Sequence, residues 1–304
     1  MTHPLPPSCE NTAIPDVDDD ARRPDPLAFG WRFAVWLLVF PLAAWLRARH
    51  TWSADTACVL LLGLNIAHGV HLQHQTLHLS GFRSRRANEV AGVLLGLPAL
   101  VSYYQYRISH LFHHAKIGTP EHNATYDFRF RQRSWLERAR MYLLPQHCLA
   151  FPSQMLRFVR GIDIHPYRPA QQPNVRRFYG VAAVALLLLA LWCIGERSAA
   201  PAVIWLIALT GVALPVHALT EYPEHVGCER QSTDLFANTR SISSNALMRW
   251  YTNANNLHVE HHVAPDLPFH RLAPLHHRLR PLMQHVEPGY LAFYYRRVAG
   301  ERSV

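Results

Sequence analysis

The sequence predicts an all-α integral membrane protein in which four transmembrane helices are joined to a helical cap. Its mean hydropathy is close to zero, at −0.06, yet the apolar residues are concentrated in a few long runs. Three clusters of histidines stand near the ends of these runs or in the polar segments between them. Apolar runs that alternate with polar segments are typical of a chain that crosses a membrane several times.

Four runs are long enough to cross a bilayer. A helix needs ~20 apolar residues to span a hydrocarbon core of ~30 Å. The second run is longer than one crossing requires, and its last residues include His74 and His78. A tight turn at Glu196 and Arg197 separates the third run from the fourth. The predicted spans are residues 27–46, 56–82, 178–195 and 198–220.

The segments outside the spans differ in composition. Residues 1–26 are rich in proline and aspartate, which predicts a disordered N-terminal tail ahead of one domain over residues 27–304. Residues 90–106 form a short apolar stretch broken by Pro98, and we expect a re-entrant or interfacial piece there. The arginine-rich residues 115–177 are expected to lie on the membrane surface.

The basic residues predict the orientation of the chain. Four spans place the tail, the central polar segment and the C-terminal region on one side of the membrane. Of the 30 lysines and arginines, only Arg47, Arg49 and Arg197 fall in the two connecting turns, which leaves 27 for the other side when Arg32 near the start of the first span is included. Positive charge is retained in the cytoplasm. We therefore expect the histidine side to face the cytosol, in the inner membrane of a bacterium.

Eight histidines occur in clusters whose spacing places their side chains on one face of a helix. Residues at i, i+3 and i+4 project from the same side of a helical turn. Eight imidazoles exceed the four ligands of a tetrahedral zinc and suit two metals of higher coordination number. The clusters are His74 and His78, then His110, His113 and His114, then His258, His261 and His262.

The sequence around these clusters resembles the membrane-bound fatty acid desaturases and their hydroxylase relatives, which are defined by three histidine boxes. The similarity runs from about Trp31 to Leu282. It is closest over residues 255–268, which read Asn-Asn-Leu-His-Val-Glu-His-His-Val-Ala-Pro-Asp-Leu-Pro. It also covers residues 74–92 and 106–120.

The resemblance implies a catalytic domain that holds a pair of irons and uses dioxygen as co-substrate, with no catalytic residues beyond the metal ligands. Members of the family usually have one more histidine after the last span, which makes His225 the expected ninth ligand. Glu221 precedes His225 by one helical turn and can bind a metal or hold a water molecule. His71 shares a helix face with His74 and is expected to be a further ligand or a polar group beside the metals.

The implied reaction is the desaturation of an acyl chain carried by a lipid or a thioester. Hydroxylation by an enzyme of the same family is the alternative. A histidine-rich metal transporter is more remote, because transporters place their ligands near the bilayer midplane. Nucleic-acid binding is disfavoured despite a net charge of +9, since no recognised binding motif accompanies the charge.

Electrons are expected to come from a separate protein such as a ferredoxin, because no segment of the sequence offers ligands for a haem or an iron–sulfur cluster. A set of arginines near the first two boxes has two interpretations. They contact lipid headgroups, or they dock an acidic electron carrier. They are Arg83, Arg85, Arg86, Arg129, Arg131, Arg133, Arg138 and Arg140.

Overall fold

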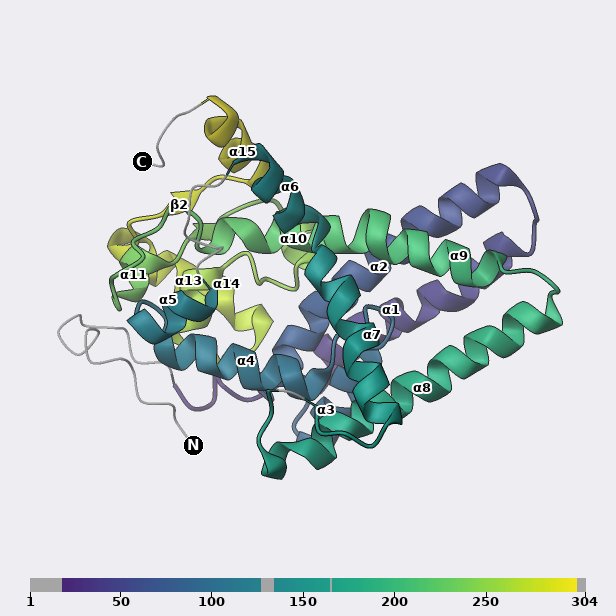
Figure 1. Ribbon diagram of the computed structural model, residues 1–304. Coiled ribbons are helices and arrows are strands. Elements are labelled where there is room, and N and C mark those ends of the chain that lie inside the picture. Colours follow the sequence, from purple (N-terminus) through teal and green to yellow (C-terminus); the bar gives the residue numbers. More distant parts are fainter. Residues whose placement is uncertain (1–17, 127–133, 165, 300–304) are drawn as a thin grey trace.

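The computed structural model describes residues 18–126, 134–164 and 166–299, and their regular elements are almost all helices (Figure 1). The two strands, β1 (Ser241–Ile242) and β2 (Val286–Glu287), are only two residues long each and pair in parallel, with Ser241 opposite Val286. The prediction of an all-α chain is confirmed.

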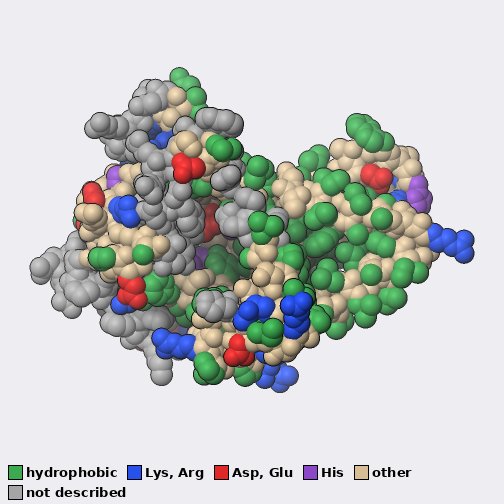
Figure 2. Space-filling view, viewed as in Figure 1, with side chains coloured by type: hydrophobic (Ala, Val, Ile, Leu, Met, Phe, Trp, Pro, Cys, Tyr) green, Lys and Arg blue, Asp and Glu red, His purple; other side chains and the backbone are tan. Residues whose placement is uncertain are grey.

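Four helical segments are long and apolar enough to cross a membrane, as predicted. Their outer faces expose many leucines, and hydrophobic side chains cover the right-hand part of Figure 2, over α8 and α9. The first two are α1 (Pro26–Arg47) and α2 (Trp52–Leu77). The third joins η3 (Pro169–Gln171) to α8 (Gln172–Gly195). The fourth runs through α9 (Ala200–Ile207), η4 (Ala208–Ala213), α10 (Leu214–Glu221) and η5 (Tyr222–Glu224).

Capping residues set the ends of the first two helices. The side chain of Asp25 accepts hydrogen bonds from the first backbone N–H groups of α1, and Thr51 does so for α2. As a result α2 begins at Trp52 rather than at residue 56. It also ends before His78, and the predicted continuation to residue 82 is wrong. The chain leaves the helix there because Leu79 adopts a left-handed conformation with φ of 61°.

The second and fourth spans approach each other closely. The π-helical segment η4 packs against α2, where Gly63 faces Val212. A Cβ atom at position 63 would lie 2.4 Å from Cβ of Val212, so only glycine allows this approach. The contact holds together the two helices that lead to His74 and His225.

An ion pair ties the two connecting turns together. Arg47 at the end of α1 contacts Glu196, which follows α8, at 3.4 Å between Nη2 and Oε2. Both turns therefore lie at one end of the four-helix unit. The starts of α1 and α8 and the ends of α2 and α10 lie at the other end.

The remaining helices form a cap at that other end (Figure 1). The expected re-entrant piece is in fact two helices, α3 (Arg85–Gly96) and α4 (Tyr103–Lys116), between which the chain reverses at Leu100, with φ of 57°. The others are α5 (Pro120–Tyr126), α6 (Trp135–Leu143), α7 (Pro145–Val159), α11 (Leu235–Asn238), α12 (Ala246–Tyr251), α13 (His258–Val263), α14 (Phe269–Leu279), η6 (Arg280–Leu282) and α15 (Tyr290–Ala299).

The largest buried cluster of apolar side chains joins the cap to the first span. It includes Phe29 of α1, Leu95 of α3 and Leu272 of α14. Part of the predicted tail also contacts this body, since Ala21 packs against the cluster and Arg22 forms an ion pair with Asp266. Residues 1–17 lie outside the described residues.

Candidate metal centre

The structure gathers nine histidines into two groups, and they are the nine that the sequence predicts as metal ligands. Within each group the nitrogens that can bind a metal lie within 4.8 Å of one another. The first group is His74, His78, His110, His114 and His261, and the second is His113, His225, His258 and His262.

Two helices supply histidines to both groups. On α4, His110 and His114 face the first group, while His113 between them faces the second. On α13, His261 faces the first group, whereas His258 and His262 face the second. A shared pair of helices requires the two groups to lie side by side.

The distances between ring nitrogens fit ligands around a metal. The Nε2 atoms of His78 and His110 are 2.8 Å apart, and those of His113 and His262 are 3.2 Å apart. A metal–nitrogen bond of ~2.1 Å separates neighbouring ligands by about 3.0 Å at right angles and by about 3.4 Å in a tetrahedron. The observed spacing is therefore compatible with neighbouring ligands of one metal.

Hydrogen bonds at the far side of two rings select the tautomer that a metal needs. Nδ1 of His225 donates to the backbone oxygen of Asn238 at 3.1 Å, and Nδ1 of His74 donates to Oδ1 of Asn255 at 3.1 Å. Each Nε2 atom is then left with a lone pair. Nε2 of His225 lies 3.1 Å from Nε2 of His258, and lone pairs that converge in this way suit a bound cation.

Burial keeps these imidazoles in the neutral form that binds metals. The pKa values of His110, His261 and His262 lie well below the usual 6.5, because burial disfavours the charged form and the neighbouring histidines add repulsion. Ligand histidines must be deprotonated to bind. The residues present therefore fit two metal ions at neutral pH.

The sequence analysis did not single out Glu224, which lies beside the second group. Its Oε2 atom is 3.2 Å from Nε2 of His258, the same spacing as between the imidazoles. This carboxylate can supply a fifth ligand to the group that has only four histidines. Glu221, by contrast, lies outside both groups and pairs with His217 at 3.1 Å. His71 also lies outside them and bonds Thr220 at 3.0 Å between Nε2 and Oγ1.

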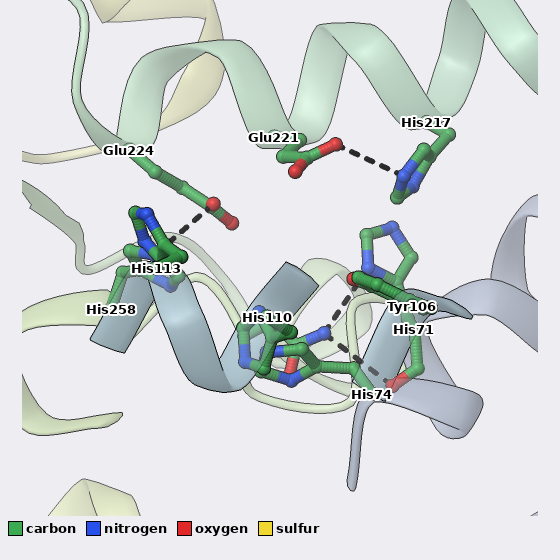
Figure 3. Close-up of a pocket in the computed structure, with 10 residues that line it drawn as sticks. His71, His74, Tyr106, His110, His113, His217, Glu221, Glu224 and His258 are labelled. Atoms are coloured by element: carbon green, nitrogen blue, oxygen red, sulfur yellow. Dashed lines mark hydrogen bonds and ion pairs between the residues drawn. The ribbon is translucent and has the colours of Figure 1, made fainter. Parts of the chain in front are cut away.

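Two neighbouring cavities lie at or beside the histidine groups. A small one of about 20 Å³, large enough for one water-sized molecule, is lined by members of both groups and by Glu221 and Glu224 (Figure 3). A larger apolar one of about 210 Å³ lies among α2, η4 and α10. Both cavities are lined by Tyr106, His217 and Glu221, so the apolar space lies next to the cavity at the metal groups.

Further polar residues contact the two helices, α4 and α13, that carry histidines of both groups. His122 lies 2.7 Å from His113, between Nε2 and Nδ1, and the buried Glu260 pairs with His276. Glu260 also accepts a hydrogen bond from Ser241, so α13, α14 and β1 are fixed to one another. The sequence analysis left His122 and His276 without a role. The position of Glu260 inside the third box is the one sequence signal that points to such a contact.

Comparisons with known proteins agree with this geometry. A protein-family model described as "Fatty acid desaturase" matches residues 50–294. An sn-1 acyl-lipid omega-3 desaturase (ferredoxin) of Synechocystis sp. is 25% identical over 252 residues, 73% of this chain and 67% of its own. A human sphingolipid delta(4)-desaturase/C4-monooxygenase is 25% identical over 276 residues, 88% and 76% of the two chains. An endoplasmic-reticulum omega-3 fatty acid desaturase of Nicotiana tabacum is 25% identical over 286 residues, 85% and 67% of the two.

The match to the family model covers most of the chain. It begins just before α2 and ends within α15, so it contains three of the four spans and all nine histidines of the two groups. The relationship therefore extends over the membrane helices and the candidate metal centre together. This chain belongs to the fatty acid desaturase family.

Proposed function

We propose that this protein is a membrane-bound di-iron enzyme that uses dioxygen and external electrons to introduce a double bond into an acyl chain. Membership of the family makes it an integral membrane oxidoreductase of the desaturase and hydroxylase type. The observation that carries the finer proposal is the pair of adjacent groups with five and four imidazoles. Such a donor set suits two irons better than one tetrahedral zinc.

The positions of the cavities suggest which residues would hold the metals and which would hold the acyl chain. Iron bound to the two groups would supply the oxidising chemistry with dioxygen that an unactivated C–H bond requires. The apolar walls formed by Ile66, Val70 and Leu214 would hold the acyl chain. Tyr106 lines both cavities and would border the methylene that lies nearest the metals. The small volume of the inner cavity would keep bulk water away from it.

Glu221 and His217 would handle protons at this boundary. They form a pair on the wall that the two cavities share, beside the metal groups rather than within them (Figure 3). In this position the carboxylate of Glu221 would hold a water molecule or a proton. His71 would orient Asn255, which lies 3.3 Å away between Nδ1 and Nδ2 and bonds the ligand His74.

Hydroxylation is the second candidate function. The human relative carries both desaturase and monooxygenase in its name, so one family member is associated with both outcomes. The two reactions begin with the same attack on a C–H bond and differ in whether a second hydrogen is lost. Mass spectrometry of lipids from cells with and without the gene distinguishes them. Loss of two hydrogens supports desaturation, and gain of one oxygen supports hydroxylation.

The metal content tests the proposal directly. Full-length protein purified in detergent after iron-replete expression is expected to contain about two irons per chain, as its two groups of ligands imply. Elemental analysis gives the stoichiometry, and Mössbauer spectroscopy identifies the iron. A single metal per chain, or tightly held zinc in protein that remains active, would contradict the di-iron assignment.

The proposed partners are an acyl-chain lipid or acyl thioester, the membrane and an external donor such as a ferredoxin. A ferredoxin appears in the name of the relative from Synechocystis. The excess of arginine on the metal side supports a cytosol-facing centre in a bacterial inner membrane. The arginines proposed for donor docking lie mostly outside the described residues: 129, 131 and 133 do, as do the side chains of 138 and 140.

Salt dependence tests the electron supply. Attraction between an acidic carrier and the arginine-rich face decays over ~10 Å at 0.1 M salt. Turnover at limiting carrier is therefore expected to fall as the ionic strength rises, while turnover driven by a small chemical reductant stays constant. A variant with Arg131, Arg133, Arg138 and Arg140 changed to Glu should show the high-salt rate at low salt. If carrier-driven turnover is equally fast in the variant and the parent, these arginines contact lipid and do not dock the carrier.

A further inference from the structure

A third cavity, of about 230 Å³ and lined by both polar and apolar side chains, lies between α3, α4 and the start of α8. It shares no lining residue with the two cavities at the metal groups, so it is a separate site. Its polar lining consists of Arg85, Glu89, Tyr103, Tyr104, Arg107, Gln171 and Asn174.

Two arginines of this cavity lack acceptors for their N–H groups. Within the part of the chain that the structure describes, Arg85 and Arg107 form no ion pair or side-chain hydrogen bond. The Nη1 atom of Arg107 is shielded from solvent and has no partner. Arg85 is exposed and Arg107 is half-buried, so the shielded Nη1 atom is the group that needs an acceptor. A shielded donor without an acceptor is costly, and a bound ligand is one way to supply the acceptor.

The charge of the cavity identifies the sign of that ligand. Arg85 lies close enough to Arg107 to repel it, and burial together with this repulsion lowers the pKa of Arg107. Arg177 adds a third guanidinium beside Tyr104. Glu89 is the one acid in the lining, and its Oε1 atom already accepts a hydrogen bond of 2.5 Å from the Tyr104 hydroxyl. The cavity therefore carries a net positive charge that an anion would neutralise.

The location of the cavity indicates an amphiphilic anion. Asn174 lies in the first turn of α8, at the end of the third span that is on the side of the metal centre. Apolar side chains beside it are exposed, among them Val90 and Leu94 on α3 and Val184 further along α8. Figure 2 shows basic side chains at the lower edge of the molecule, next to the hydrophobic surface. This is the level at which lipid headgroups meet a protein.

We propose that this cavity binds the phosphate group of a membrane lipid, whose acyl chains lie along the exposed apolar residues of α3 and α8. The guanidinium groups of Arg85 and Arg107 present paired N–H donors that match phosphate oxygens. The bound phosphate supplies the acceptor that Nη1 of Arg107 lacks. This site is independent of the metal centre and of the reaction proposed for it.

The test compares two lipids that differ only in the phosphate. The full chain in detergent is titrated with phosphatidic acid or with diacylglycerol of the same acyl chains, and bound lipid is measured by native mass spectrometry. The parent is expected to prefer phosphatidic acid. An Arg85→Gln/Arg107→Gln variant should lose about tenfold in affinity for it, the effect of losing charged hydrogen bonds. An Arg49→Gln/Arg197→Gln variant removes the same charge at the opposite end of the spans and should match the parent.

Stability and competition separate the remaining outcomes. Without lipid, Arg107→Gln should unfold at the same temperature as the parent or higher, because it removes a half-buried charge whose shielded Nη1 atom has no partner. A clear loss of stability in that variant would mean that Arg107 serves the fold, and the proposal would fail. The proposal would also fail if the Arg85→Gln/Arg107→Gln variant kept the parent's preference for phosphatidic acid. Displacement of the lipid by millimolar inorganic phosphate would assign the site to the free ion instead of a lipid.

Discussion

Replacing His225 by alanine is expected to abolish turnover and to lower the iron content from about two per chain to about one. His225 belongs to the group of four histidines, and its Nδ1 atom is held by Asn238 so that Nε2 faces His258. Removing it leaves three imidazoles, whereas the other group keeps all five. Elemental analysis and product assay of the purified variant measure the two effects.

A matched control shows that the effect is specific to the metal centre. His285 lies just before β2 and belongs to neither group, so His285→Ala should keep two irons and normal turnover. His110→Ala should lose metal from the first group instead. An active His225→Ala variant with two irons would remove His225 from the ligand set and leave the three boxes untouched.

Much of the fold follows from the sequence, because local rules determine it. The length of an apolar run limits where a helix can cross a membrane, and all four spans are confirmed. Helical spacing also predicts that His258, His261 and His262 project from one turn, and α13 contains that turn. Neither conclusion depends on how distant parts of the chain pack.

The division of the histidines into five and four depends on tertiary structure. Spacing places His110, His113 and His114 on one face of α4, yet His113 serves a different group from its neighbours. Which ring joins which group depends on the angle at which α4 and α13 meet. Periodicity within one helix carries no information about that angle.

The carboxylates show how a local rule fails at a helix end. The expectation for Glu221 assumed α-helical spacing up to His225. Instead α10 ends at Glu221 and the next three residues form a 3₁₀ turn that contains Pro223. A 3₁₀ turn rotates about 120° per residue instead of about 100°. The change brings Glu224, rather than Glu221, within 3.2 Å of His258.

Filling the apolar cavity is expected to reduce turnover of long acyl chains while leaving both irons in place. Ala213 on η4 lines this cavity together with Ala67 of α2. A phenylalanine at position 213 would occupy the space of roughly three methylenes, each worth about 0.8 kcal/mol when buried. The value of kcat/KM for a long chain should then fall roughly 50-fold. Assays over a series of acyl lengths measure the change.

The chain-length dependence separates a blocked cavity from a damaged protein. A shorter acyl chain needs less of the cavity, so its kcat/KM should fall less in Ala213→Phe than that of a long chain. Val184→Phe adds the same ring to an exposed position on the outer face of α8 and should behave like the parent. Iron content should stay at about two in both variants, since neither position adjoins a histidine of the two groups. An equal loss for all chain lengths, or no loss at all, would place the acyl chain outside this cavity.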